Sequence, residues 1–160
     1  MSAVILFGLS YLVSRVIVRV DAHVWLVSRV LAKAGSGAGF LLALMLVTLA
    51  VSAALPNMLA VLAITPLVAV VGRQLPVGQR ERDALITTLI LGIVYAANVG
   101  GVASLVGSPS NGIVLLALAK ADLPSTELLT FFRWLAFGVP LSLVFILGAW
   151  AMLARIRRGS

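Results

Sequence analysis

The chain has 160 residues, of which 62% are hydrophobic and 11% are charged, and its formal net charge is +7. Apolar runs of 18 or more residues without a charge are typical of helices embedded in a bilayer, so an all-α integral membrane protein is predicted. The absence of cysteine excludes thiol chemistry and cysteine-ligated metals. The basic residues lie at the ends of apolar segments, where they mark membrane faces, so no nucleic-acid partner is predicted.

The first predicted unit, residues 1–35, consists of a membrane-crossing helix and an interfacial amphipathic helix. The crossing helix occupies residues 4–20. The stretch that follows, DAHVWLVSRVLAKAG, places its apolar side chains at helical spacing opposite Arg29 and Lys33. At about 13 residues it is too short to cross the bilayer, so we predict that it lies in the membrane interface, with His23 as an interfacial polar group.

The second unit, residues 36–75, contains an apolar run over residues 40–71. Its 32 residues are more than one span needs and too few for two spans of about 20 residues each. Pro56 and Asn57 lie almost at its centre. Two interpretations remain: one long kinked span, or a re-entrant hairpin that turns at residues 55–57 and leaves the membrane on the side where it entered.

The distribution of basic residues favours the re-entrant hairpin. A hairpin places ten Lys and Arg residues on one side of the membrane and two, Lys120 and Arg133, on the other, whereas a full crossing places six on each side. Membrane proteins usually carry their excess of Lys and Arg on the cytoplasmic side. We therefore predict a hairpin that opens to the cytoplasm, in a multi-pass protein of the plasma membrane (in bacteria, the inner membrane). Its N-terminus lies outside and its C-terminus in the cytoplasm.

The third unit, residues 76–122, contains an apolar run that is interrupted by the stretch YAANVGGVASLVGSPSNG, residues 95–112. The glycines of this stretch weaken a helix. Pro109 lacks a backbone donor and disfavours helical geometry at Ser108. We predict a discontinuous membrane-crossing helix: residues 84–97, an unwound linker, and a second half that starts near Pro109 with Ser108 as its N-cap.

The fourth unit, residues 123–160, holds an ordinary membrane-crossing helix over residues 131–153 and a basic tail, ARIRRGS, that we expect in the cytoplasm. The chain is thus predicted to have three membrane-crossing helices, one of them discontinuous. One re-entrant helical hairpin and one interfacial amphipathic helix complete the predicted fold.

The two interruptions indicate a binding site. Unwound backbone leaves carbonyls that can coordinate a cation, and a new helix N-terminus presents amides to an anion. Each interruption carries an asparagine, Asn57 or Asn111, and the neutral oxygens nearby suit Na⁺ better than a transition metal. The structural alternative is a set of glycines that lets helices pack closely, with Ser and Asn bonding across the interface. The sequence shows no carboxylate pair or nucleophile–base arrangement, so no enzyme is predicted.

These two segments make the sequence similar to the ion transporter superfamily, nearest the divalent anion/sodium symporters and the arsenite-pump-like proteins. NVGGVASLVGSPSNG resembles that family's Gly-Gly-x-x-[ST]-x-x-Gly-[ST]-Pro-Pro-Asn motif, with Ser110 in place of the second proline. SAALPNMLAVLAITPLVAV resembles the family's re-entrant hairpin, with Asn57 at the tip and Pro66 in the return arm. At the tip, Pro56-Asn57-Met58 stands where dicarboxylate symporters usually have Ser-Asn-Thr.

The resemblance, which covers about residues 5–153, implies one of the two inverted repeats from which these transporters are built. Such transporters bind their substrate between the two repeats, near the membrane midplane. A second subunit with the inverted counterpart is therefore expected, as a heteromer rather than an antiparallel homodimer because of the charge bias. The other interpretation is that the chain is a piece of a longer protein.

The leading hypothesis is a half-size, lipid-embedded subunit of a secondary active transporter. It moves a small anion, a carboxylate or an inorganic oxyanion, coupled to Na⁺ or H⁺, by the elevator-like displacement that the family implies. The alternatives are a non-transporting assembly or regulatory subunit, or a pore of identical subunits. The predicted substrate contacts are Asn57, Ser108, Pro109 and Asn111. The predicted Na⁺ ligands are Ser52, Asn57, Gly100, Gly101, Ser104 and Gly107.

Overall fold

The computed structural model describes residues 37–74, 77–105, 107–120 and 131–158, and the single positions 12, 16, 19 and 29. This part of the chain is all-helical, as predicted. Its helices are α3 (Ala38–Ala54), α4 (Asn57–Gln74), α5 (Gln79–Ala103), α6 (Pro109–Lys120) and α7 (Phe131–Arg158). Apart from those single positions, the predicted first membrane-crossing helix and the interfacial helix, with His23, lie outside the described residues.

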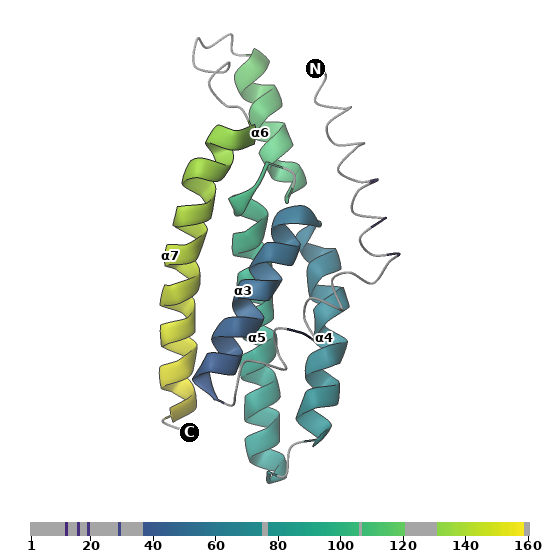
Figure 1. The fold of residues 1–160 in the computed structure, drawn as a ribbon, viewed down its shortest axis with the longest axis vertical. Coiled ribbons are helices and arrows are strands. Elements are labelled where there is room, and N and C mark those ends of the chain that lie inside the picture. The colour runs from purple at the N-terminus through teal and green to yellow at the C-terminus, as the bar shows by residue number, and fades with distance from the viewer. Residues whose placement is uncertain are drawn as a thin grey trace.

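Two residues, Leu55 and Pro56, separate α3 from α4, and the chain reverses its direction there (Figure 1). Leu55 has extended backbone angles, φ −120° and ψ 151°, which is the geometry that a following proline favours. The Pro56 carbonyl then accepts the Ala60 N–H at 3.2 Å and starts the next helix. The 32-residue apolar run is therefore divided into two helices at the position that the sequence predicts.

The discontinuous helix is present, but its first half extends further than predicted. α5 continues past residue 97 to Ala103, and the unwound segment starts at Ser104, whose backbone is extended at φ −131° and ψ 155°. Gly100 and Gly101 are therefore helical residues, and the prediction that they lie in the unwound linker is wrong. Both are buried against α3 and α4, and this packing outweighs the low helix propensity of glycine. Pro109 is the first residue of α6, as predicted.

α5 lies at the centre of the described structure, and α3, α4 and α7 pack around it (Figure 1). Its buried face carries residues at helical spacing, among them Leu89, Ile93 and Ala96. The neighbouring helices and the α3–α4 turn contribute further fully buried apolar side chains, which are Leu41, Leu44, Met45, Leu55, Ile64, Val68 and Ile146. This core holds the α3–α4 turn against the end of α5.

Helix α7 is attached to the other helices by three side-chain donors. The indole N–H of Trp134 donates to the Val102 carbonyl at 2.9 Å, and that of Trp150 donates to the Ala38 carbonyl at 2.8 Å. Between them, the Ser142 hydroxyl donates to the Val99 carbonyl at 3.2 Å. Pro140 lies inside α7 without ending it. These bonds fix α7 along α5 and against the start of α3.

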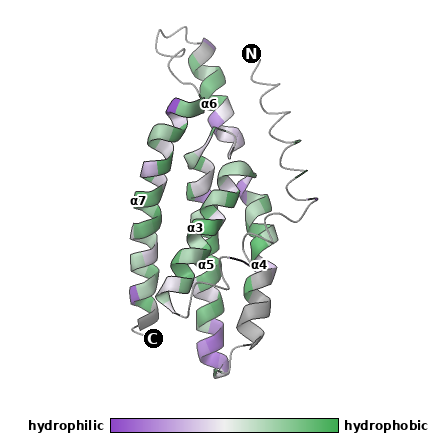
Figure 2. Ribbon diagram, viewed as in Figure 1, coloured by the Kyte–Doolittle hydropathy of each residue, from purple (hydrophilic) through white to green (hydrophobic). Residues whose placement is uncertain are grey.

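Among the described helices, α5 and the Phe131–Ile156 part of α7 are long and apolar enough to cross a membrane. Shorter apolar helices occupy Ala38–Ala54, Asn57–Pro66 and Pro109–Leu118. Apolar colour covers most of the length of the helices, whereas hydrophilic colour marks the lower end of α5 and the region where α4 and α6 begin (Figure 2). Large apolar side chains are exposed on α4, α6 and α7, which is typical of a surface that contacts lipid or another protein.

Candidate functional site

The candidate site lies where the α3–α4 turn meets the unwound segment between α5 and α6. We call residues 104, 105, 107 and 108 of this segment the break. Polar side chains from the turn and from both sides of the break come together here. The helices around them consist largely of apolar residues (Figure 2). Such a placement is costly in a membrane unless the polar groups bond to one another or to a ligand.

Ser52, in the last turn of α3, links the turn to α5. Its side chain is fully buried, and its Oγ lies 2.6 Å from the Ala97 carbonyl and 3.2 Å from Asn57 Oδ1. A hydroxyl has one proton to donate. The shorter contact takes that proton, so the Ser52 Oγ–H donates to Ala97, and Asn57 Oδ1 faces a hydroxyl oxygen whose proton is already used.

Ser104, the first residue of the break, makes the reciprocal link. Its hydroxyl donates to the Ala53 carbonyl of α3 and accepts the Gly107 N–H at 3.0 Å. Its side chain is buried, with 2% of its surface exposed. Ser52 and Ser104 therefore connect α3 and α5 in opposite directions. Ser52 of α3 donates to a carbonyl of α5, and Ser104, which follows α5, donates to a carbonyl of α3.

Asn111, in the first turn of α6, holds the two sides of the break together. Its side-chain Nδ2 donates to the Gly101 carbonyl at 2.7 Å and to the Ser104 carbonyl at 2.8 Å. Gly101 belongs to the last turn of α5, where carbonyls lack an intrahelical partner. The amide of Asn111 thus replaces the helical hydrogen bonding that the break removes.

The glycines of this region permit close contact between backbones. A Cβ on Gly107 would lie 2.8 Å from the Ser52 carbonyl oxygen, and a Cβ on Gly100 would lie 2.6 Å from the Leu49 carbonyl oxygen. A Cβ on Gly101 would overlap the carboxamide of Asn57. Each side chain larger than hydrogen would therefore separate the turn from α5 or displace Asn57.

Two predicted site residues lie outside this network of contacts. Ser108 is half-buried, and its Oγ accepts the Ser110 N–H at 3.4 Å, the bond expected of a residue that caps α6. Pro109 is exposed at the start of α6. They lie at the positive end of the α6 dipole, and we call the side of the break that they occupy its outer side.

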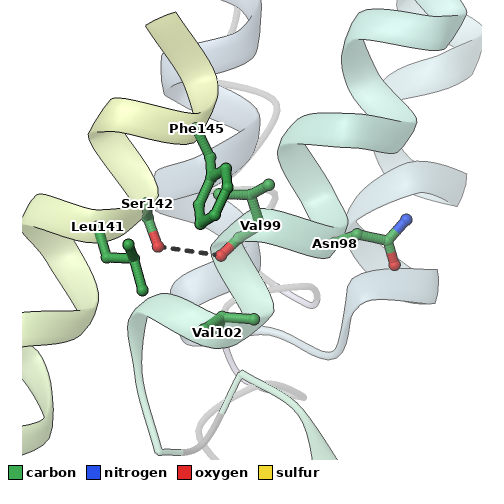
Figure 3. A pocket seen from close by; sticks show the side chains of 6 residues that line it. All are labelled: Asn98, Val99, Val102, Leu141, Ser142 and Phe145. Carbon is green, nitrogen blue, oxygen red and sulfur yellow. Dashed lines mark hydrogen bonds between the residues drawn. The ribbon is translucent and has the colours of Figure 1, made fainter. Parts of the chain in front are cut away.

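A cavity of about 310 Å³ adjoins the site on the side of α7. Its lining residues are Asn98, Val99, Val102, Leu141, Ser142 and Phe145. The Ser142 hydroxyl is bonded to the Val99 carbonyl, and the Asn98 amide extends away from Leu141 and Phe145 (Figure 3). The cavity therefore presents mainly apolar groups.

The donors at the site are neutral oxygens and amides. Within the described residues, no group of three or more His, Cys, Asp or Glu side chains could hold a metal ion. Hydroxyl, amide and carbonyl oxygens are hard, weak-field ligands that fit Na⁺ rather than a transition metal. The residues present therefore suit an alkali cation.

Seven of the predicted site residues are brought together by direct contacts: Ser52, Asn57, Gly100, Gly101, Ser104, Gly107 and Asn111. The indole N–H of Trp134, which donates to the Val102 carbonyl beside the break, was not among the predicted site groups. A tryptophan N–H in an apolar helix needs an acceptor, which is the signal that could have pointed to it.

The matches of this chain to known proteins identify its family. Residues 1–159 match the family model described as citrate transporter. The chain belongs to the citrate transporter family. Because this is a family of transporters, the membership confirms the prediction that the chain is not an enzyme.

The similarity extends to other transporters, two of which are named for sodium and dicarboxylate. The Na⁺/dicarboxylate cotransporter 3 of Homo sapiens is 30% identical over 89 residues, which cover 53% of this chain and 15% of that protein. The sodium-dependent high-affinity dicarboxylate transporter 3 of Caenorhabditis elegans is 36% identical over 80 residues, covering 48% of the chain and 14% of the relative. An uncharacterized transporter of Haemophilus influenzae is 38% identical over 68 residues, covering 42% and 13%. The chain thus matches a small part of the length of each relative.

Proposed function

We propose that this chain provides one repeat of a secondary active transporter that moves a carboxylate or an inorganic oxyanion together with Na⁺ or H⁺. The observation that carries the proposal is the contact network that joins the α3–α4 turn to the break. It concentrates oxygens and amides between two interrupted helical segments, an arrangement that secondary transporters use for ions and substrates. The relatives whose names specify sodium and dicarboxylate support this choice of solutes.

The cation ligands are proposed to be the oxygens that face the interior of the network. Asn57 Oδ1 and Ser52 Oγ lie 3.2 Å apart, and the Gly101 and Ser104 carbonyls are close enough to share one amide. Gly100 and Gly107 contribute by allowing the backbones to approach. When bound, Na⁺ supplies a positive charge that satisfies these oxygens and favours a nearby anion.

The anion is proposed to contact the donors on the outer side. Asn57 Nδ2 has two protons and makes one long bond, 3.5 Å to Asn98 Oδ1, so it has a proton for an anion. Ser108 and Pro109, at the positive dipole end of α6, are proposed to contribute to the same anion site. Both Nδ2 protons of Asn111 are bonded to carbonyls, so its proposed role is to hold the break in a binding conformation.

In the membrane, we propose that α3 and α4 form a re-entrant hairpin that opens to the cytoplasm. α5 and α6 form the discontinuous crossing helix and α7 the last one, within the units 1–35, 36–75, 76–122 and 123–160. Arg73 at the end of α4, Arg80 and Arg82 at the start of α5, and the basic residues of the C-terminal tail then share the cytoplasmic side of the plasma membrane. Movement of the site across the membrane is proposed to be elevator-like.

Transporters of this kind bind their substrate between two repeats, and this chain is proposed to provide one of them. We propose that the counterpart comes from an inverted repeat in a second subunit, or in the remainder of a longer protein. The charge bias favours two different chains over two copies inserted in opposite directions. The exposed apolar residues of α4 and α6, such as Met58, Leu62 and Ile113, are available for this contact.

Transport in liposomes tests the proposal. The chain, reconstituted with its counterpart, is expected to accumulate labelled citrate, succinate or sulfate when an inward Na⁺ or H⁺ gradient is applied. The double variant Asn57→Ala/Asn111→Ala is expected to lose uptake at least tenfold, since one ligand-binding amide and the bonds that close the break are removed. Ser110→Ala, an exposed neighbour, is the matched control. Equal uptake by the double variant and the wild type would refute the assigned site, and a chain that binds the counterpart without any uptake would indicate an assembly subunit.

A further inference from the structure

Asn98 lies on the exposed face of α5, one turn before Gly101. Its side-chain amide bonds to a hydrogen-bond acceptor on one side and to a donor on the other. Its Nδ2 donates to the Val94 carbonyl at 2.9 Å, and its Oδ1 accepts from Asn57 Nδ2 at 3.5 Å. It is thus bonded at one end to a fixed backbone group and at the other to a residue of the candidate site.

The Val94 carbonyl determines how this pair of amides is oriented. A carbonyl oxygen can only accept, so the Asn98 atom beside it must be the donor, Nδ2. The oxygen of Asn98 then faces Asn57, and only the Nδ2 end of Asn57 can bond to it. Rotating either amide by 180° would place two oxygens, or two NH₂ groups, in contact.

This order leaves the oxygen of Asn57 directed inward. Asn57 Oδ1 lies against Gly101 and 3.2 Å from Ser52 Oγ, whose proton goes to the Ala97 carbonyl. Two electron-rich oxygens thus adjoin each other, an arrangement that a cation stabilises. If Asn57 were rotated, Nδ2 would donate to Ser52 Oγ instead and would fill the place of the cation with a proton donor.

We propose that Asn98 is a positioning residue that keeps the Asn57 oxygen directed toward the cation and its amide proton toward the solute. The inference rests on the proposed cation site and adds a residue that touches neither ion. A side chain at position 98 acts in this way only if it both donates to Val94 and accepts from Asn57. A hydroxyl on a helix can make the first of these bonds, since Thr48, Thr65 and Thr88 each donate to the carbonyl four residues earlier, and its oxygen keeps lone pairs for the second.

The test measures Na⁺ binding by the purified chain in detergent rather than transport. The melting midpoint is recorded against NaCl concentration, with choline chloride holding the ionic strength constant, because a ligand that binds the folded state raises the midpoint. Asn98→Leu removes both the donor and the acceptor, and it is expected to raise the half-saturating Na⁺ concentration about tenfold. Asn98→Thr keeps both and is expected to stay within about threefold of the wild type.

Leu91→Ala, on the same exposed face of α5, is the matched control and is expected to leave the Na⁺ response unchanged. Tryptophan emission in choline chloride checks that each variant is folded, and Asn98→Ala replaces Asn98→Leu if the larger side chain disturbs folding. A wild-type response that Asn57→Ala abolishes and Asn98→Leu leaves unchanged would overturn this inference alone. Equal losses in Asn98→Leu and Asn98→Thr would also overturn it. A wild type without any Na⁺ response would overturn the cation site itself.

Discussion

The carboxamide of Asn57 occupies the space beside Gly101 in which any other residue at position 101 would carry its Cβ. One residue starts α4 and the other lies in the last turn of α5. The contact brings the α3–α4 turn to the end of α5, and it makes position 101 a direct probe of the site.

Gly101→Ala is expected to impair binding more than folding. The new methyl group overlaps the end of a side chain, which can rotate away, so Asn57 would leave its position while the backbone stays in place. We expect Na⁺-dependent uptake to fall at least tenfold and the melting midpoint to change little. Gly148→Ala, in α7 with nothing within 4 Å of the added carbon, is the control and should be neutral or slightly stabilising. Uptake by Gly101→Ala at the wild-type level would contradict the position of Asn57.

Gly100→Ala, one residue earlier, is expected to impair folding more than binding. Its Cβ would lie 2.6 Å from the Leu49 carbonyl oxygen and 2.9 Å from Ser52 Cβ, and the backbone of α3 cannot rotate aside. Separation of α3 from α5 should cost about 1–3 kcal/mol, measured as a lower melting midpoint in detergent. A Gly100→Ala variant as stable as the wild type would show that the two helices are less closely packed.

Asn111→Ala is expected to destabilise the break. It leaves the Gly101 and Ser104 carbonyls without their 2.7 Å and 2.8 Å partners in a buried region, at a cost of about 1–3 kcal/mol for each carbonyl. Hydrogen exchange should show faster opening of residues around the break than in the wild type. The adjacent and exposed Ser110→Ala should exchange like the wild type, and a similar effect of both variants would argue against the specific role of Asn111.

The two indole bonds of α7 are expected to contribute independently to stability. Trp134→Phe and Trp150→Phe each remove one donor, to the Val102 and Ala38 carbonyls, while retaining an aromatic ring. Each should lower the free energy of unfolding by about 0.5–1.5 kcal/mol. Because the two sites are about 24 Å apart along α7, the double variant should show the sum of the two effects. A strongly non-additive result would mean that α7 detaches as a unit.

The membrane topology can be tested by single-cysteine labelling, because the chain has no cysteine of its own. Gly78→Cys, exposed between α4 and α5, should react with a membrane-impermeant maleimide from the cytoplasmic side. Arg133→Cys, exposed near the start of α7, should react from the opposite side. Labelling of both positions from one side would rule out the proposed crossing of α5 and α6.

The positions of the turn and of α6 could be predicted from the sequence because they depend on local backbone chemistry. Pro56 and Pro109 remove a donor and restrict the preceding residue, whatever the rest of the chain does. Gly100 and Gly101 were misplaced for the opposite reason. Their low helix propensity is a local effect of about 1 kcal/mol, and the packing of α3 and α4 against them outweighs it.

The sequence could indicate which polar residues are candidates for the site, but it could not predict their hydrogen bonds. Residues such as Ser52 and Asn111 were recognisable as polar groups in apolar segments. Their partners are carbonyls, which every residue has, and the one that Ser52 reaches lies 45 positions along the chain. Only the packing of α3 on α5 selects Ala97 as that partner, and the sequence contains no local sign of it.

The reciprocal serine bonds have a mechanical consequence. Sliding the tip of the α3–α4 pair past the end of α5 would remove the hydrogen-bond donors of the Ala97 and Ala53 carbonyls at the same time, and both donors are the hydroxyls of buried serines. Shear is therefore unfavourable at this junction. If the site moves across the bilayer, we expect the tip and the start of α6 to move as one rigid body, with the hinges at the far ends of these helices.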